Sequence, residues 1–163
     1  MSAGHMSAGD TGAGDPGGTA ELAARQEALV RAMTAGGPLP PGFDAAAVRA
    51  AADAILRKRA GEVARAWPAL AACYGDRWRA AFTAWAAERP TRGSFRDSWD
   101  FARAHRDELS PAVALELALR ETRWDYDGTG EPRLRKAAFR RVPGGFAVQV
   151  RGRLRVFGKA ARR

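Results

Sequence analysis

The feature that most constrains the fold is a change in the spacing of apolar residues close to Gly130. Before it, apolar side chains recur at intervals of three and four, as at Val48, Ala52 and Ile55. After it they occupy every second position, as at 146, 148 and 150. The first spacing predicts amphipathic helices and the second predicts strands. The sequence therefore predicts an α+β fold, a mainly helical bundle followed by a small C-terminal antiparallel sheet.

Prolines, glycines and capping residues divide the helical part into about five to six helices. We expect helices over residues 19–35, 45–66, 69–74, 77–89, 94–106 and 111–123. Asp44 and Ser110 have the side chains that cap helix N-termini, and Asp76 and Ser94 are further candidates, Ser94 in a capping box with Asp97. Pro68 cannot donate a backbone hydrogen bond, so the second helix should end at Trp67.

Three short strands are expected over residues 138–142, 146–150 and 153–157. Pro143-Gly144-Gly145 and Arg151-Gly152 have the composition of tight turns, which predicts an antiparallel meander. We expect one face of it to be apolar and the other to be rich in arginine. A sheet this small is marginally stable alone, so its apolar face should pack on a helix or on a partner.

These elements suggest three segments. Residues 1–18 are rich in Gly, Ser and Ala and contain an apparent tag remnant at Gly4-His5-Met6, so we expect a disordered tail. Residues 19–109 form the expected helical domain, and residues 110–163 a module of one helix and the basic meander. Neither a membrane span nor a secretory signal is evident, so we expect a cytoplasmic protein without a membrane partner.

The net charge of +9 is concentrated at the C-terminal end. Residues 1–130 contain 16 basic and 17 acidic side chains, whereas residues 131–163 contain 11 basic and one acidic. Such a field attracts phosphates, acidic peptides or an acidic protein face. The alternative is that these arginines are simply exposed to solvent on the outside of the strands and bind no partner. The candidate partner- or anion-binding residues are Lys58, Arg59, Arg140, Arg141, Arg151, Arg153 and Arg155.

Catalytic chemistry is poorly represented, and we expect a protein that is not an enzyme and has no cofactor. His105 is the histidine outside the tag remnant, and Cys73 lies between apolar residues, which favours a packing role. No phosphate-binding glycine loop is present, and no set of side chains has the spacing of a metal site.

Several short motifs recur in an order that is similar to a known family. They are Gln26, Pro41-Gly42-Phe43, Leu56-x-Lys58-Arg59, Ala66-Trp67-Pro68-x-Leu70, Gly75, Phe82 with Trp85-Ala86, and Ser94-x-x-Asp97-x-x-x-Phe101-Ala102. Over about residues 20–106 the chain resembles a bacterial helical family described as DNA-binding domains. Members of that family accompany multinuclear non-heme iron oxidative (MNIO) enzymes, which are TIM-barrel oxidases that modify cysteine-bearing peptides.

The resemblance implies a non-catalytic accessory protein. Its partners would be a TIM-barrel iron oxidase, on which it docks, and the ribosomal precursor peptide of that enzyme. Lys58 and Arg59 match the motif. They would either contact the partner enzyme or belong to a solvent-exposed face of the helix. Trp67-Pro68 is interpreted as a helix break with an aromatic plug. A DNA-binding or regulatory protein that uses the basic C-terminal strands is the alternative.

Overall fold

The computed structural model describes residues 16–158, and within them the α+β prediction is confirmed. The helical elements are α1 (Pro16–Ala35), α2 (Ala45–Ala66), α3 (Pro68–Tyr74), the 3-10 turn η1 (Gly75–Arg77), α4 (Trp78–Ala86), α5 (Ser94–Ala104), the 3-10 turn η2 (Arg106–Glu108) and α6 (Pro111–Arg123). The strands are β1 (Trp124–Asp125), β2 (Arg133–Leu134), β3 (Ala137–Val142), β4 (Gly145–Val150) and β5 (Arg153–Gly158).

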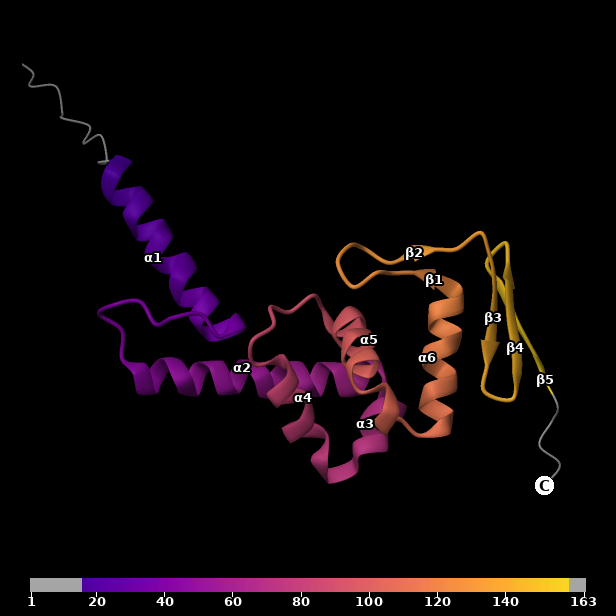
Figure 1. Ribbon diagram of the computed structural model, residues 1–163. Helices are drawn as coiled ribbons and strands as arrows, with labels where there is room; N and C mark the ends of the chain where they lie inside the picture. The colour runs from indigo at the N-terminus through magenta and orange to yellow at the C-terminus, as the bar shows by residue number, and fades with distance from the viewer. Residues whose placement is uncertain (1–15, 159–163) are drawn as a thin grey trace, which may run out of the picture.

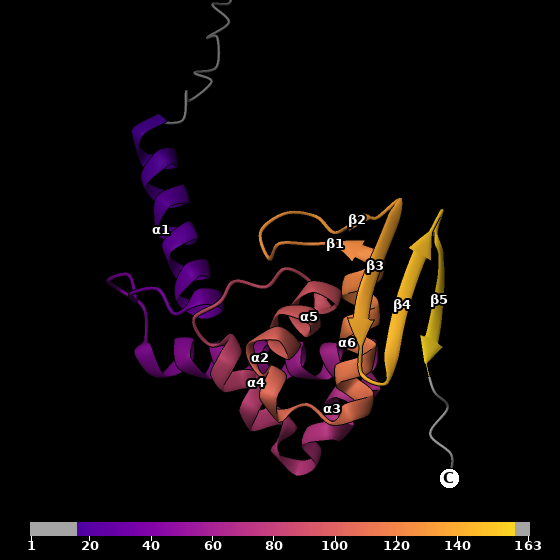
Figure 2. The ribbon, with the colours of Figure 1, turned by 45° about the vertical axis from the view of Figure 1, so that its right-hand side comes forward.

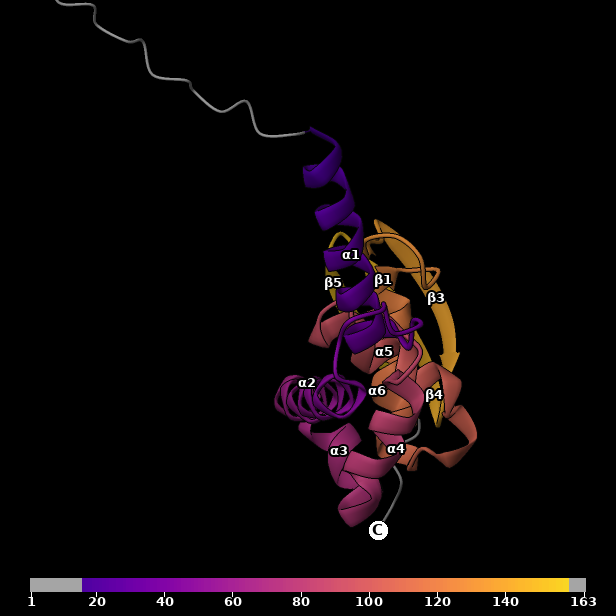
Figure 3. The ribbon, with the colours of Figure 1, turned by 90° about the vertical axis from the view of Figure 1, so that its left-hand side faces the viewer.

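The helices from α2 to α6 surround one core, and α1 projects away from it (Figure 1). Leu70, Phe82, Trp99 and Phe101, which come from α3, α4 and α5, are fully buried in this core. Viewed from the helical side, α2 is seen almost end-on and α1 rises above the bundle (Figure 3). Leu22 and Val30 of α1 are both more than half exposed, so α1 is held mainly through its C-terminal turns.

The limits of α2 follow the expected local chemistry. Asp44 Oδ1 accepts a hydrogen bond from the backbone N–H of Ala46 at 2.9 Å, as an N-cap should. The helix ends at Ala66, and Pro68 is the first residue of α3, where its missing N–H costs nothing. The Trp67 side chain is 3% exposed. The predicted helix break with an aromatic plug is therefore confirmed.

Three predicted helix starts differ from the structure. Helix α1 begins at Pro16 rather than Thr19, so residues 16–18 are helical, and residues 1–15 of the predicted tail lie outside the described residues. Asp76 lies in η1 and makes no capping bond to α4. Ser94 is the first residue of α5, behind an N-cap at Gly93 with φ 87°. The predicted capping box is wrong because Asp97 turns inward, toward Arg59.

The C-terminal meander has strand order β3-β4-β5, with both pairs antiparallel. It covers one side of α6, opposite the rest of the helical bundle (Figure 2). At the predicted turn between β4 and β5, Arg151 and Gly152 both have positive φ, 49° and 81°. That pairing matches the twist of a two-residue hairpin. The short hairpin of β1 and β2 was not predicted.

The predicted assignment of the two faces is wrong for β4 but holds for β5, whose Leu154 packs against the cluster on α6. Ala147 and Gln149 are fully buried against α6, whereas Phe146 and Val150 are about half exposed. The small Ala147 side chain permits close contact with Ala118 and Val142. The Gln149 Nε2 donates to the carbonyls of residues 123 and 135, at 3.4 and 3.0 Å, while its Oε1 is buried without a hydrogen-bond partner among the described residues.

No helix among residues 16–158 combines the length and the apolar character that crossing a membrane requires.

Candidate binding face of the sheet

The side of the meander that points away from α6 is the candidate site, and we call it the outer face. Strand register and alternation place nine side chains there, three from each strand. From β3 to β5 the rows are Ala137, Val150 and Arg153; Phe139, Val148 and Arg155; and Arg141, Phe146 and Phe157. Apolar and arginine side chains therefore share one face, whereas the sequence analysis placed them on opposite faces.

The aromatic side chains of the outer face are unusually exposed. Phe139 is 69% exposed and stacks on Phe146, with ring centroids 5.3 Å apart and an interplanar angle of 23°. Phe157 is 54% exposed and Val150 51%. Contiguous apolar surface of this kind on a small domain marks a place where another molecule binds.

The arginines of the outer face lack acidic neighbours. Arg141, Arg153 and Arg155 are exposed, and none has an ion-pair partner in the described part of the chain. The sequence contains no Asp or Glu from residue 132 to residue 158. Guanidinium groups without internal partners can hold carboxylates or phosphates bidentately.

A groove runs over β4 and β5 on this face. Its volume is about 600 Å³, and its walls come from two kinds of side chain. Val148, Val150 and Phe157 supply apolar surface, and Arg151, Arg153 and Arg155 supply the charge. The groove can hold an apolar group together with flanking anionic groups.

Arg140 does not belong to the expected guanidinium face, because neighbouring residues on a strand point to opposite sides. It points toward α6, and its Nη1 lies 3.2 Å from Glu121 Oε2. Arg103 Nε and Arg106 Nη2 each lie 2.9 Å from Glu121 Oε1. Burial raises the pKa of Glu121, but hydrogen bonds and charges from Arg103 and Arg106 lower it more, so the pKa lies below its ordinary value. Arg140 thus belongs to a joint between sheet and bundle.

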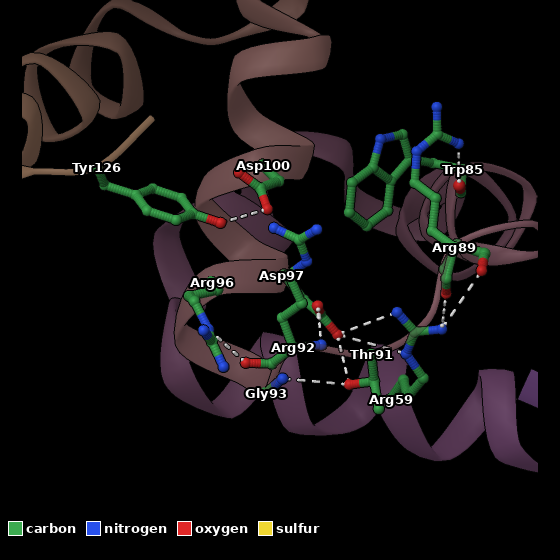
Figure 4. A network of polar contacts seen from close by, with 11 residues as sticks. Arg59, Trp85, Arg89, Thr91, Arg92, Gly93, Arg96, Asp97, Asp100 and Tyr126 are labelled. Atoms are coloured by element: carbon green, nitrogen blue, oxygen red, sulfur yellow. Dashed lines mark hydrogen bonds and ion pairs between the residues drawn. The ribbon is translucent and has the colours of Figure 1, made fainter. Parts of the chain in front are cut away.

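The structure separates the two helical candidates, Lys58 and Arg59. Arg59 is 6% exposed, and its Nε and Nη2 donate to Asp97 Oδ2 at 3.3 and 3.1 Å (Figure 4). Its Nη1 donates to the carbonyls of residues 86 and 89. Asp97 also accepts from the Thr91 hydroxyl and the Arg92 backbone N–H, both at 2.9 Å. Arg59 is a buried structural residue and not a surface contact.

Lys58, its neighbour, points into solvent. Its Nζ lies 3.9 Å from Glu62, one helical turn away, and its side chain is 77% exposed. Lys58 is therefore accessible to a partner, but it lies on α2 and not on the outer face of the sheet.

A second polar contact fixes the loop between β1 and β2. The Tyr126 hydroxyl donates to Asp100 Oδ2 at 2.7 Å (Figure 4). Burial together with this hydrogen bond raises the pKa of Tyr126 to about 12, and burial raises the pKa of Asp100 above its ordinary value. Arg92 donates to the carbonyl oxygens of Gly128 and Thr129. These bonds connect the loop to α5 and to the segment before it.

His105 and Cys73 each have a local packing partner. The His105 ring stacks on Phe101 at 4.3 Å, and its Nδ1 lies 3.0 Å from the Phe101 carbonyl oxygen. Cys73 Sγ accepts from the backbone N–H of Ser110 at 3.1 Å. Among residues 16–158, no group of three or more His, Cys, Asp or Glu side chains is placed to hold a metal ion.

The contribution of Phe146 and the β4 valines to the site was not predicted from the sequence. These residues were expected on a packed face, because alternation alone does not say which face of a strand is covered. The available signal was the small Ala147 next to a helix that contains Ala118. Small side chains on both elements favour close approach, and would have indicated the covered face.

Fold and site together define an α+β domain with a helical bundle and a basic, aromatic strand surface. The chain belongs to the SCO6045-like, C-terminal domain family, whose sequence profile matches residues 23–107, just over half of the chain. This match covers α1 from Ala23 through α5 and most of η2, and it ends before α6 and the sheet.

A UPF0276 protein from Streptomyces avermitilis is similar to half of the chain. The two are 40% identical over 82 residues, which are 50% of this chain and 17% of that protein. This chain therefore corresponds to only about a sixth of the length of that relative. No solved structure matches the chain.

Proposed function

We propose that this chain is a non-catalytic accessory protein that docks on an iron-dependent peptide-modifying oxidase and helps bind its precursor peptide. The helical bundle contacts the enzyme, and the outer face of the sheet binds the peptide. The enzyme is a TIM-barrel oxidase, and the peptide is ribosomally made. This proposal develops the resemblance in the order of motifs between about residues 20 and 106.

The longer relative supports a docking role for the bundle. In the Streptomyces protein, the segment similar to this chain is 17% of the length, so a segment of this kind is part of a much larger chain. The family description also names a C-terminal domain. A domain that is fused to a larger chain in one protein is a reasonable candidate to bind a counterpart of that chain in another.

The observation that carries the peptide-binding role is the composition of the outer face. Exposed phenylalanines and arginines without acidic neighbours share one sheet surface, and they lie outside the residues matched by the family. Interfaces are enriched in aromatic residues and arginine, which combine large apolar area with directional hydrogen bonds. The surface is therefore suited to an acidic segment that also carries apolar side chains.

The docking claim is tested by size-exclusion chromatography of the full chain with a TIM-barrel iron oxidase of the proposed class. We expect co-elution at micromolar concentrations. A variant with both Arg153→Ala and Arg155→Ala should co-elute as well, because these residues lie on the sheet and not on the bundle. Separate elution of the wild-type chain and the oxidase would contradict the proposal.

Single-stranded nucleic acid is a second candidate ligand, because Phe139, Phe146 and Phe157 lie beside arginines on an open sheet. Bases stack on such aromatic platforms, and arginines neutralise the phosphates. In that case the affinity should fall steeply with salt, and replacing Arg151, Arg153 and Arg155 by alanine should reduce the slope by up to about three. Binding that does not depend on salt would exclude it.

A further inference from the structure

We infer that the groove over β4 and β5 recognises a specific peptide pattern, one large apolar side chain with acidic residues on both sides. This inference rests on the proposed function, in which the outer face binds the peptide, and it names the chemistry of the segment bound. The floor of the groove takes the apolar side chain. The arginines at its edge and end take the carboxylates.

The apolar part of the pattern follows from the central strand. Phe146, Val148 and Val150 follow one another on the outer side of β4, and Phe157 lies beside Phe146 on β5. Val148, Val150 and Phe157 line the groove of about 600 Å³, a volume large enough for an aromatic or branched side chain. Covering exposed apolar surface of this kind is the main source of affinity in such a contact.

The acidic part follows from the edge strand. Arg153 and Arg155 are two residues apart on the outer side of β5, so their Cα atoms are separated by about 6.8 Å. An extended peptide places every second side chain on one side with the same repeat. Acidic residues at alternate positions can therefore each reach an arginine. Neither arginine has an internal acidic partner within residues 16–158.

Arg151 adds an independent observation at the end of the groove. Its φ of 49° makes it the non-glycine residue with a positive φ in the described chain. Glycine or asparagine fills such a turn position with less strain, so an arginine there lowers the stability somewhat. Its side chain lines the groove. The backbone at this turn does not favour arginine, so we attribute the presence of Arg151 to the charge that it brings to the groove.

The test measures fluorescence anisotropy of three labelled synthetic peptides with the full chain. The first has a central phenylalanine with aspartates at alternate positions on both sides. In the second, asparagine replaces each aspartate, and in the third, serine replaces the phenylalanine. We expect the first peptide to bind about tenfold or more tightly than either of the others, because each lacks one component of the pattern. Equal binding of all three would overturn the inference.

Two variants locate the site. Arg151→Asn should weaken binding of the first peptide about threefold to tenfold while unfolding at the same or a higher urea concentration, because asparagine tolerates the turn. Arg79→Ala on α4, which is exposed and remote from the sheet, should bind like the wild type. Unchanged binding by Arg151→Asn would overturn the role of that residue.

A fourth probe, a short labelled oligothymidylate, distinguishes a peptide site from a nucleic-acid site. Tighter binding of this oligonucleotide than of the first peptide at the same salt would overturn the inference. Co-elution with the oxidase is a separate measurement. If the chain co-elutes with the oxidase but does not discriminate among the peptides, this inference fails and the docking role stands. If it discriminates but does not co-elute, the docking role fails.

Discussion

Two adjacent residues of α2 show how the fold assigns different roles to similar side chains. Lys58 and Arg59 both matched the motif and both were candidate contacts. In the structure Lys58 is 77% exposed, whereas Arg59 is 6% exposed and hydrogen-bonded to Asp97 and two backbone carbonyls. Each nitrogen of the Arg59 guanidinium group donates a hydrogen bond to a group inside the bundle. Arg59 in this motif therefore has a structural role in the fold.

The Arg59 and Asp97 pair gives a stability prediction. Asp97→Ala removes the carboxylate and leaves a buried guanidinium without its counter-charge, which should lower the free energy of unfolding by about 3–5 kcal/mol. Lys58→Ala, one position away, should change it by less than about 0.5 kcal/mol, because its ion pair is long and exposed. Urea unfolding followed by tryptophan fluorescence measures both. Equal effects of the two substitutions would contradict the assignment.

Some of the roles of individual residues could be predicted from the sequence. The caps at Asp44 and Ser110 and the break at Pro68 depend on local chemistry and are confirmed. The role of Asp97 could not be predicted, because its partner Arg59 is 38 residues away and no local signal links them. Local rules favoured a helix cap at Ser94, and a long-range buried pair determined the outcome.

At the scale of elements, β4 is the strand whose two faces decide the site. Ala147 and Gln149 are buried against α6, and Phe146 and Val150 remain exposed. A strand with apolar residues at both odd and even positions does not identify its covered face. The meander and its turns could therefore be predicted from the sequence, whereas the packed face of β4 was inverted and that of β5, with Leu154, was predicted correctly.

The face assignment predicts opposite tolerance at neighbouring positions. Ala147→Leu adds volume to a fully buried contact with α6 and should destabilise the protein by about 1–3 kcal/mol. Val150→Thr lies on the outer face and should cost less than about 0.5 kcal/mol. Thermal unfolding by circular dichroism compares them. A larger loss for Val150→Thr than for Ala147→Leu would show that the opposite face is covered.

The Glu121 joint makes the attachment of the sheet depend on pH. The pKa of Glu121 is lowered in the folded state, so its contribution is fully present above its ordinary unfolded pKa and is lost as the pH falls through the folded value. We expect Glu121→Gln to cost about 2–3 kcal/mol at pH 7, since it leaves Arg103, Arg106 and Arg140 without a counter-charge.

The pH dependence is measured by urea unfolding of wild type and Glu121→Gln between about pH 7 and about pH 3. The difference between the two proteins should shrink toward low pH, because protonation removes the charge from the wild type as well. Asp125→Asn is a matched control, because its ion pair with Arg135 is exposed and should contribute little at any pH. A difference that stays constant with pH would contradict the role of the Glu121 charge.

At the scale of the whole molecule, two parts of the chain have different relationships to known proteins. The matched family segment, residues 23–107, runs from within α1 through α5 into η2, and α6 with the sheet lies beyond it. The net positive charge lies almost entirely in the part beyond it. The Glu121 joint links the two parts through salt bridges to η2, α5 and β3. We therefore propose that the bundle docks on the enzyme while the outer face binds the peptide.

The proposal that the bundle docks on the enzyme and the outer face binds the peptide is tested most directly by measuring binding of the precursor peptide to the complex of the full chain with the oxidase. Labelled precursor is titrated with complexes that contain the wild-type chain or a variant with Arg141, Arg153 and Arg155 all replaced by alanine. We expect both complexes to form and the variant to bind the precursor at least about a hundredfold more weakly. Equal affinity of the two complexes for the precursor would contradict the account.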